Sequence, residues 1–455
     1  MQSDQGFLAR SMRSAFKIEP HESRAALLSF AFVLILMTAY YILRPIRDAM
    51  SSDWTDAELS TLFTVTFLFS FVFVSAYGAA CARITFRRLV PAVYAFFAVS
   101  FLAFYIAVQD AGEADWVRRS FYVWVSVFSL FHISVFWSYM ADIFDRNQAP
   151  RLFGFISAGA SIGAIIGPSI TVLLVDVVGR DALLLISATL LLVPIGIIAV
   201  LSRDHRDDPA SGPPLPAKIG GNPLAGFSLF VRNPYLLGIA AFILLYTAIS
   251  TFVYFELKNL MDGVDETTRV QIWSGMDLAV NVLAIATAMF GTSRLTLRFG
   301  LTTTLVLVPV LITAGLLIVV FSPLLAVVIG LQIVRRAGNY AITRPGREML
   351  FTTVDRESRF KAKSVIDIVV YRGGDALTAW AFTGLTQGLG LGLAAVAAVG
   401  AAIAAIWAFV GRQLGRAYTK SNDVHVAEAA RRIAAARPAS KIDGQSARPA
   451  EEGQQ

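Results

Sequence analysis

The sequence has little cysteine, little histidine and little charge. Its 455 residues include a single cysteine, Cys81, and four histidines, which excludes a disulfide framework and leaves too few ligands for a structural zinc site or an iron–sulfur cluster. Charged residues make up 16% of the chain and hydrophobic residues 56%, against about 25% charged residues in ordinary soluble domains. So much apolar side chain excludes a set of soluble domains and a disordered chain. We therefore expect a membrane protein that holds no metal and no cofactor.

Long apolar runs divide the chain into membrane-spanning segments. A transmembrane helix needs about 20 mostly apolar residues, and twelve stretches of the sequence meet this condition. The expected fold class is therefore an all-α membrane protein with twelve transmembrane helices. The predicted helices are residues 25–47, 58–82, 89–109, 118–142, 152–175, 182–201, 235–257, 269–291, 301–320, 323–349, 362–386 and 391–411.

Basic residues gather in segments that lie on one side of the predicted bundle. They are Arg10, Arg13, Lys17, Arg24, Arg83, Arg87, Arg88, Arg294, Arg298, Arg412, Arg416 and Lys420. By the positive-inside rule this side is cytoplasmic, so we expect both termini in the cytoplasm and a bacterial inner-membrane location. The same bias accounts for the net charge of +7. We expect the lipid bilayer and a small solute as partners, not nucleic acid, and a monomer.

A polar segment rich in proline and glycine, residues 202–234, separates the first six predicted helices from the last six. The halves resemble each other: YYILRPIRDAM from Tyr40 aligns with TFVYFELKNLM from Thr251, and RLFGFIS from Arg151 aligns with RFKAKSV from Arg359. Both matches have nearly the same offset, which predicts a 6+6 parallel repeat. The expected units are the cytoplasmic segment 1–24, the six-helix halves 25–201 and 235–411, the linker, and a largely disordered tail 412–455 with one helical candidate, AEAARRIAAA.

Charged side chains inside the membrane are costly and are therefore candidates for function. At the end of the first predicted helix, Tyr40, Arg44 and Arg47 fall within about 60° of one another at 100° per residue, with Asp48 beside them. This cluster predicts an anion contact in a central cavity. The alternative is that both arginines lie at the outer rim of the bilayer and extend to lipid headgroups.

The tenth predicted helix places Arg336, Tyr340 and Arg347 on one face about 40° wide. Arg336 would lie near the middle of the bilayer. Its planar guanidinium suits phosphate or carboxylate, and the nearby tyrosine can stack on a planar ring. The alternative is an internal ion pair between Arg336 and an acid such as Asp142 or Asp277, which would hold the halves together.

The eleventh predicted helix carries two sets of charges. Lys361, Arg372 and Asp375 share one helix face, whereas Lys363 and Asp367 form an i, i+4 pair on another side. We expect Lys361 to contact the substrate and the Lys363–Asp367 pair to be structural.

Several further charges allow more than one interpretation. Arg344, Arg347 and Glu348 would lie near the cytoplasmic mouth, where they are candidates for a gate. The single acids Asp142, Asp277 and Glu256 could each relay a proton or pair with a basic residue.

Bases outnumber acids among the residues expected in the cavity, which favours an anionic solute. The predicted substrate-binding residues are Tyr40, Arg44, Arg47, Arg336, Tyr340, Arg347, Lys361 and Arg372. The predicted gating or coupling residues are Asp48, Asp142, Asp277, Glu348, Lys363, Asp367 and Asp375.

Three segments resemble the nucleotide transporter family, the ATP/ADP antiporters of plastids and intracellular bacteria and their free-living bacterial relatives. They are GREMLFTTVDRESRFKAKSVIDIVVYRGGDAL from Gly346, LRPIRDAM from Leu43 and FWSYMADIF from Phe136. The resemblance implies a major-facilitator-type fold with alternating access and exchange of nucleotides. It implies functional roles for Arg47, where the family's exchangers favour lysine, for Asp142, where they favour glutamate, and for Lys361 or Lys363.

The leading hypothesis is therefore a secondary transporter that exchanges an anionic solute, most simply a nucleotide of the ATP/ADP type. The sequence lacks a GxxxxGK[ST] phosphate-binding loop, so transport would be driven by exchange or by an ion gradient. One alternative is a proton-coupled carrier of another small organic anion or drug-like solute, with Asp277 or Asp142 titrating. Another is a non-transporting membrane partner or lipid-handling protein. An enzyme is not expected, since no nucleophile–base or metal constellation is visible.

Overall fold

The computed structural model of the chain describes residues 19, 21–81, 83–111, 114–145, 148–204, 233–354 and 366–436. Within these residues the regular secondary structure is helical throughout. An apolar chain that crosses lipid must satisfy its own backbone hydrogen bonds, which a helix does within one segment. The expected all-α fold class is confirmed.

Two groups of helices form the molecule, and the polar linker separates them in sequence. The first group consists of α2 (Ser23–Met50), α3 (Asp56–Cys81), α4 (Phe86–Ala111), α5 (Asp115–Ile143), α6 (Ala149–Leu190) and α7 (Val193–Asp204), with a 3-10 turn η1 (Ser51–Asp53) after α2. We call this group the N half.

The second group, the C half, alternates α-helical with π-helical turns. It consists of α9 (Pro234–Leu260), α10 (Glu266–Thr287), η2 (Ala288–Thr292), α11 (Ser293–Phe321), α12 (Leu325–Gly338), η3 (Asn339–Thr343), α13 (Arg344–Leu350), η4 (Phe351–Thr353), η5 (Ile366–Gly373), α15 (Gly374–Thr383), η6 (Gly384–Gly388) and α16 (Leu393–Ala436). Of these, η2, η3, η5 and η6 are π-helical and η4 is a 3-10 turn.

Nine helices of the described residues are long and apolar enough to cross a membrane. One of them, Arg151–Arg203, is 53 residues long and includes Gly179 at φ 74°, a backbone conformation that suits glycine and turns the chain between two predicted helices. Gly300, at φ 78°, likewise ends the eighth predicted helix before the ninth. The chain is thus a multi-pass membrane protein, and the total of twelve crossings stays a prediction.

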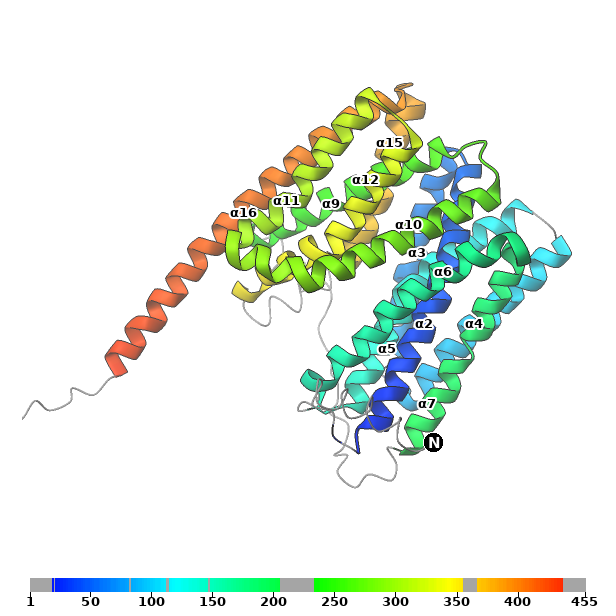
Figure 1. Cartoon of the computed structure of the whole chain (residues 1–455), viewed down its shortest axis with the longest axis horizontal. Coiled ribbons are helices and arrows are strands. Elements are labelled where there is room, and N and C mark those ends of the chain that lie inside the picture. The colour runs from blue at the N-terminus through cyan, green and yellow to red at the C-terminus, as the bar shows by residue number, and fades with distance from the viewer. Residues whose placement is uncertain are drawn as a thin grey trace, which may run out of the picture.

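Figure 1 shows the two halves in contact at one end and diverging toward the end at which the N-terminus is marked. At the contact, α10 packs against α6 and α2, and α15 packs against α3. Ion pairs join the halves there: Lys258 Nζ lies 2.8 Å from Asp56 Oδ1, and Arg269 Nη2 lies 2.6 Å from Asp53 Oδ1. Glu266 of α10 also pairs with Arg180 of α6. We call the region around these six residues the closed end.

The C-terminal helix is longer than the sequence suggests. α16 has 44 residues, or about 66 Å at 1.5 Å per residue, and Figure 1 shows its last turns projecting beyond the bundle. The part of the tail up to Ala436, for which the sequence predicts disorder, is therefore helical and includes the candidate AEAARRIAAA. Residues 437–455 lie outside the described part of the chain.

Glycines allow α6 to approach α2 closely. A Cβ atom placed on Gly163 would lie 2.3 Å from the carbonyl oxygen of Leu34, and one on Gly167 would lie 2.7 Å from that of Thr38. Small residues at such positions let two helix backbones pack together. The neighbouring Gly154 differs, since a Cβ atom there would meet nothing within 4 Å.

Substitution of these glycines should therefore have opposite outcomes. Gly163→Ala forces the backbones apart, and we expect a loss of about 1–3 kcal/mol of stability, whereas Gly154→Ala should leave stability unchanged or slightly raised because alanine is the better helix former. The measurement is thermal unfolding of the two purified variants in the same detergent. Equal melting temperatures for both variants would contradict this account of the α2–α6 contact.

Candidate functional site

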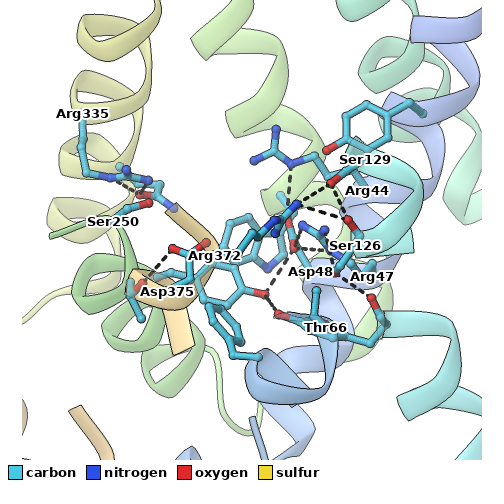
Figure 2. Close-up of a pocket in the computed structure, with 17 residues that line it drawn as sticks. Arg44, Arg47, Asp48, Thr66, Ser126, Ser129, Ser250, Arg335, Arg372 and Asp375 are labelled. Atoms are coloured by element: carbon cyan, nitrogen blue, oxygen red, sulfur yellow. Dashed lines mark hydrogen bonds and ion pairs between the residues drawn. The ribbon is translucent and has the colours of Figure 1, made fainter. Parts of the chain in front are cut away.

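A polar cavity lies between the halves, beside the closed end. Its volume is about 230 Å³. Side chains of α2, α3 and α5 line it from the N half, and side chains of α9, α10, α12, η5 and α15 line it from the C half, as Figure 2 shows in part. The lining residues are Tyr40, Arg44, Arg47, Asp48, Phe63, Thr66, Tyr122, Ser126, Ser129, Ser250, Thr251, Tyr254, Trp273, Gln332, Arg335, Arg372 and Asp375.

The end of α2 supplies the N-half charges, as the sequence predicts. Arg47 donates from Nε to Asp48 Oδ1 at 2.9 Å and from Nη1 to Ser126 Oγ at 3.2 Å. Its guanidinium also lies over the ring of Tyr122, 5.5 Å from the ring centre. Asp48 accepts a further hydrogen bond of 3.3 Å from the hydroxyl of Tyr254, a C-half residue. The cluster therefore faces the cavity and not the outer rim of the bilayer.

Arg372 reaches the same place from the C half. Its Nη2 donates to the carbonyl oxygen of Ser126 at 3.4 Å and to Ser129 Oγ at 3.2 Å, both on α5 of the N half. Figure 2 shows Arg372 and Arg47 directed toward the same turn of α5. Asp375, one turn further along α15, accepts from Thr251 Oγ1 at 3.4 Å. Two guanidinium groups from opposite halves thus converge at the half interface.

Arg335 is a cavity residue that the sequence reasoning did not select. It donates to Gln332 Oε1 from Nε at 3.0 Å and from Nη2 at 2.7 Å, and its guanidinium lies over the ring of Tyr246. It is only 3% exposed. Arg335 is adjacent to Arg336 in the sequence, and this adjacency was the available signal for it. Adjacent residues point about 100° apart on a helix, so either arginine of the pair was a candidate to face the cavity.

Arg336 belongs to a buried ion-pair cluster instead. It pairs with Asp277 of α10, and Arg44 Nη1 lies 3.8 Å from the same carboxylate oxygen. Arg336 is 3% exposed and Asp277 1% exposed. Tyr340 is within electrostatic reach of both arginines. The Arg336–Asp277 contact matches the alternative of an internal ion pair, although both residues belong to the C half. The contact that links the halves is that of Arg44, on α2, with Asp277.

Substitution of one member of the Arg336–Asp277 pair should destabilise the protein more than substitution of both. Arg336→Gln leaves Asp277 buried beside Arg44 alone, and we expect a loss of about 3–5 kcal/mol of stability. The double variant Arg336→Met/Asp277→Leu removes both charges and should recover most of that loss. Thermal unfolding of wild type and both variants tests this, and a single variant as stable as wild type would contradict it.

The π-helical turn η3 separates Arg347 from Arg336. A wider turn changes the helical register, so the single face predicted for these arginines does not continue through Asn339–Thr343. Arg347 donates to the hydroxyl of Tyr371 at 2.5 Å and to Glu348 Oε1 at 2.9 Å, and it is not among the residues that line the cavity.

Five other charged residues predicted from the sequence lie elsewhere or outside the described part of the chain. Lys361 and Lys363 lie outside the described residues, and only the backbone of Asp367, in η5, is described. Glu256 is fully buried in α9, and neither of its carboxylate oxygens has a hydrogen-bond partner in the described part of the chain. Asp142 lies exposed near the end of α5. Neither Glu256 nor Asp142 is among the residues that line the cavity.

Within the described residues, one group of side chains could in principle hold a metal ion: Glu19, His21 and Glu22, just before α2. Arg151 already pairs with both acids, at 3.5 Å from Glu19 Oε1 and 2.8 Å from Glu22 Oε1. Partial burial raises the pKa of Glu22, but the hydrogen bonds from Arg151 and neighbouring groups outweigh it and hold the pKa below 4.5. The arrangement fits a salt bridge better than a cation site.

The sequence model of the Major Facilitator Superfamily matches residues 27–346, well over half of the chain. The chain belongs to the Major Facilitator Superfamily. The expectation of a major-facilitator-type fold is thereby confirmed.

Among curated proteins, this superfamily member is similar to ADP,ATP carriers. It is 25% identical over 308 residues to ADP,ATP carrier protein 1 of Chlamydia muridarum (strain MoPn / Nigg), a match covering 57% of each chain. It is 23% identical over 308 residues to ADP,ATP carrier protein 1 of Chlamydia pneumoniae, covering 57% of this chain and 59% of that one. The matches thus span less than two thirds of each relative. They support the resemblance predicted from the sequence.

Solved transporter structures share the fold. The crystal structure of the nucleoside transporter NupG has a TM-score of 0.58 at 12% identity, covering 87% of this chain and 99% of that one. A POT family transporter in complex with 5-aminolevulinic acid has a TM-score of 0.61 at 12% identity, covering 87% and 97%. A bacterial homolog to the human lysosomal transporter Spinster, inward-facing and unoccupied, has a TM-score of 0.53 at 15% identity, covering 89% and 98%. At these identities the likeness concerns the fold alone.

Proposed function

We propose that this Major Facilitator Superfamily protein is a secondary transporter that binds an anionic solute in the cavity between its halves. The observation that carries the proposal is that two cavity arginines have no direct ionic partner. Among the described residues, neither Arg335 nor Arg372 has a carboxylate within 4.0 Å. Arg335 is buried and Arg372 half-buried, and Asp375 acts on both only across a longer distance. A guanidinium held away from water without a direct ionic partner is costly, and an anion entering the cavity would supply that partner.

The charges and rings of the lining favour a phosphorylated or carboxylated solute with a planar group. The lining has four arginines and two aspartates, a surplus of two positive charges. Arginine forks match phosphate and carboxylate oxygens. Aromatic rings that could stack on a base come from Tyr40, Tyr122, Tyr254 and Trp273. With the similarity to ADP,ATP carriers, these features make nucleotide exchange the substrate hypothesis.

The cavity volume of about 230 Å³ is smaller than the roughly 300–1,000 Å³ of pockets that enclose whole drug-sized ligands. We propose that the charged end of the solute occupies this volume, among Arg47, Arg335 and Arg372, and that the rest extends toward the open side between the diverging halves. This assigns the ion pairs of the closed end to an inward-facing state. The inward-facing assignment agrees with the proposed twelve membrane crossings and with termini in the cytoplasm, because the halves diverge on the side of the N-terminus.

The experiment is counterflow in proteoliposomes loaded with unlabelled ATP, ADP, AMP, phosphate or a dicarboxylate, with labelled ADP outside. Nucleotide exchange predicts uptake only into vesicles that hold a nucleotide, without dependence on a proton gradient. Uptake that requires a proton gradient and no internal solute would instead support the proton-coupled carrier. No uptake of any nucleotide, with another anion from the panel transported, would remove the nucleotide assignment and leave the anion transporter.

A further inference from the structure

A second polar pocket lies away from the central cavity, at the ends of three helices of the N half. It has a volume of about 670 Å³ and is formed by the turn between α3 and α4 together with the end of α7. The side chains used below are Arg83, Thr85, Arg87, Arg88, Ser202 and Arg203. We call this site the arginine pocket.

The arginine pocket concentrates positive charge. Four arginines line it, and its lining includes no acid. Asp142 lies nearby, since both Asp142 and Arg87 act electrostatically on the hydroxyl of Tyr139, which in turn is 3.2 Å from Ser202 Oγ. Among the side chains that the structure describes at this site, the arginines outnumber the acids and leave a surplus of positive charge. Hydroxyl groups of Thr85 and Ser202 add hydrogen-bond donors. Such a set of donors suits the oxygens of a phosphate group.

The position of the pocket points to a lipid as the source of that phosphate. The apolar segments that it joins end or begin at the pocket itself: one ends at Cys81, one begins at Arg87 and one ends at Arg203. The pocket thus lies at the level where hydrocarbon gives way to headgroups. Ile84, within the lining, is 43% exposed, and Phe96 on the next helix is 51% exposed. Apolar side chains exposed beside clustered arginines fit acyl chains below a headgroup.

We propose that the arginine pocket binds the phosphate of an anionic phospholipid from the adjacent leaflet. The attraction comes from several arginines at the membrane surface, each contributing to affinity for anionic lipid and each weakened by salt. The site is independent of the transported solute, because it uses residues of the N half alone and lies outside the central cavity.

The test is lipid binding to the full-length protein in detergent, measured by native mass spectrometry and by thermal unfolding. The probes are phosphatidylglycerol, phosphatidylcholine and inorganic phosphate at equal concentrations. The variant Arg87→Gln/Arg88→Gln removes two charges from the pocket. The matched control Arg294→Gln/Arg298→Gln removes two exposed arginines from the corresponding loop of the C half, outside the pocket lining.

We expect wild type and control to prefer phosphatidylglycerol over phosphatidylcholine by at least tenfold, and the pocket variant to lose that preference. Equal loss in pocket variant and control would overturn the proposal, because it would show a diffuse attraction to basic loops. A wild type that does not distinguish the two lipids would overturn it too. Stabilisation by inorganic phosphate equal to that by phosphatidylglycerol, and lost in the pocket variant, would reassign the pocket to a soluble phosphate.

Discussion

Arg335→Gln should lower uptake of the anionic solute about 100-fold without lowering stability. Arg335 is buried in the cavity wall and is held by Gln332 and Tyr246, with no acid within 4.0 Å among the described residues. A charge-assisted contact with a buried anion is worth about 3 kcal/mol, which is a factor of about 100 in affinity. The protein itself loses only an arginine without an ionic partner, so its melting temperature should stay the same or rise.

Two companion variants make this result specific. Arg335→Lys keeps the charge but loses the planar fork, so we expect an intermediate loss of about tenfold. Arg344, a gate candidate from the sequence, is exposed beyond η3 and outside the cavity lining, so Arg344→Gln should transport like wild type. The measurement is initial uptake in proteoliposomes at matched protein density. Full activity of Arg335→Gln would show that the cavity does not use this charge.

The second large effect concerns the closed end. Asp56→Asn leaves Lys258 buried, at 2% exposure, with the carbonyl oxygen of Trp54 as its remaining partner at 2.7 Å. Loss of one partner from a buried pair costs about 3–5 kcal/mol. Because the pair joins the two halves, that cost applies to the state with the closed end shut. The population should shift by more than 100-fold toward a state in which this end is open.

Accessibility of a cysteine between the halves reports the shift. Ser60 is fully buried and lies 2.8 Å from Thr383 of the C half. Ser60→Cys, in a Cys81→Ser background, should react slowly with a membrane-impermeant maleimide and much faster when Asp56→Asn is added. The control is Glu58→Gln, which breaks a partly exposed pair with Arg119 inside the N half. It should change little, because the pair does not join the halves and solvent-accessible pairs contribute about 0–1 kcal/mol. Equal labelling in all variants would count against the closed-end account.

The double variant Asp56→Asn/Lys258→Met distinguishes the cost of an unpaired buried charge from the loss of the attraction between the two residues. Removal of both charges leaves no buried charge without a partner, so most of the lost population of the closed state should return. A variant that labels as fast as Asp56→Asn alone would show that the closed end depends on the attraction itself.

In the proposed transporter, the cavity and the closed end must be coupled. On α9, a cavity residue and a closed-end residue lie one helical turn apart. Asp48 accepts from Tyr254 of α9, and the hydroxyls of Tyr122 and Tyr254 lie 3.2 Å apart. Lys258 is one helical turn beyond Tyr254 on the same helix. A solute that changes the contacts of Asp48 would therefore act on a helix that also carries a closed-end ion pair.

The sequence predicted well the features that depend on local chemistry. The end of α2 is one example: the spacing of Tyr40, Arg44 and Arg47 placed all three on one face, and all three line the cavity. Arg372 and Asp375 were likewise predicted as cavity residues. Tyr40, Arg44 and Arg47 lie in one α-helix, so angles counted along the sequence hold in space there. Arg372 and Asp375 reach the cavity although Arg372 belongs to the π-helical η5 and Asp375 to α15.

In the tenth predicted helix, residue spacing alone did not give the correct helix faces. The face assigned to Arg336 and Arg347 assumed one unbroken α-helix, whereas η3 inserts a π-helical turn between them. The same counting could not decide between Arg335 and Arg336, because the choice depends on what each meets. Asp277, the partner of Arg336, lies on another helix far away in the sequence.

By itself, the sequence determined that the chain is an α-helical multi-pass membrane protein with basic and acidic side chains buried in it. The reason is that hydrocarbon requires long apolar segments with internally bonded backbone, and both features are visible one segment at a time. Only the tertiary structure decided which charges pair with each other and which are left for a solute. Ion pairing is settled by distances between helices, and Arg335 is distinguished from Arg336 by its neighbours in space and not in sequence.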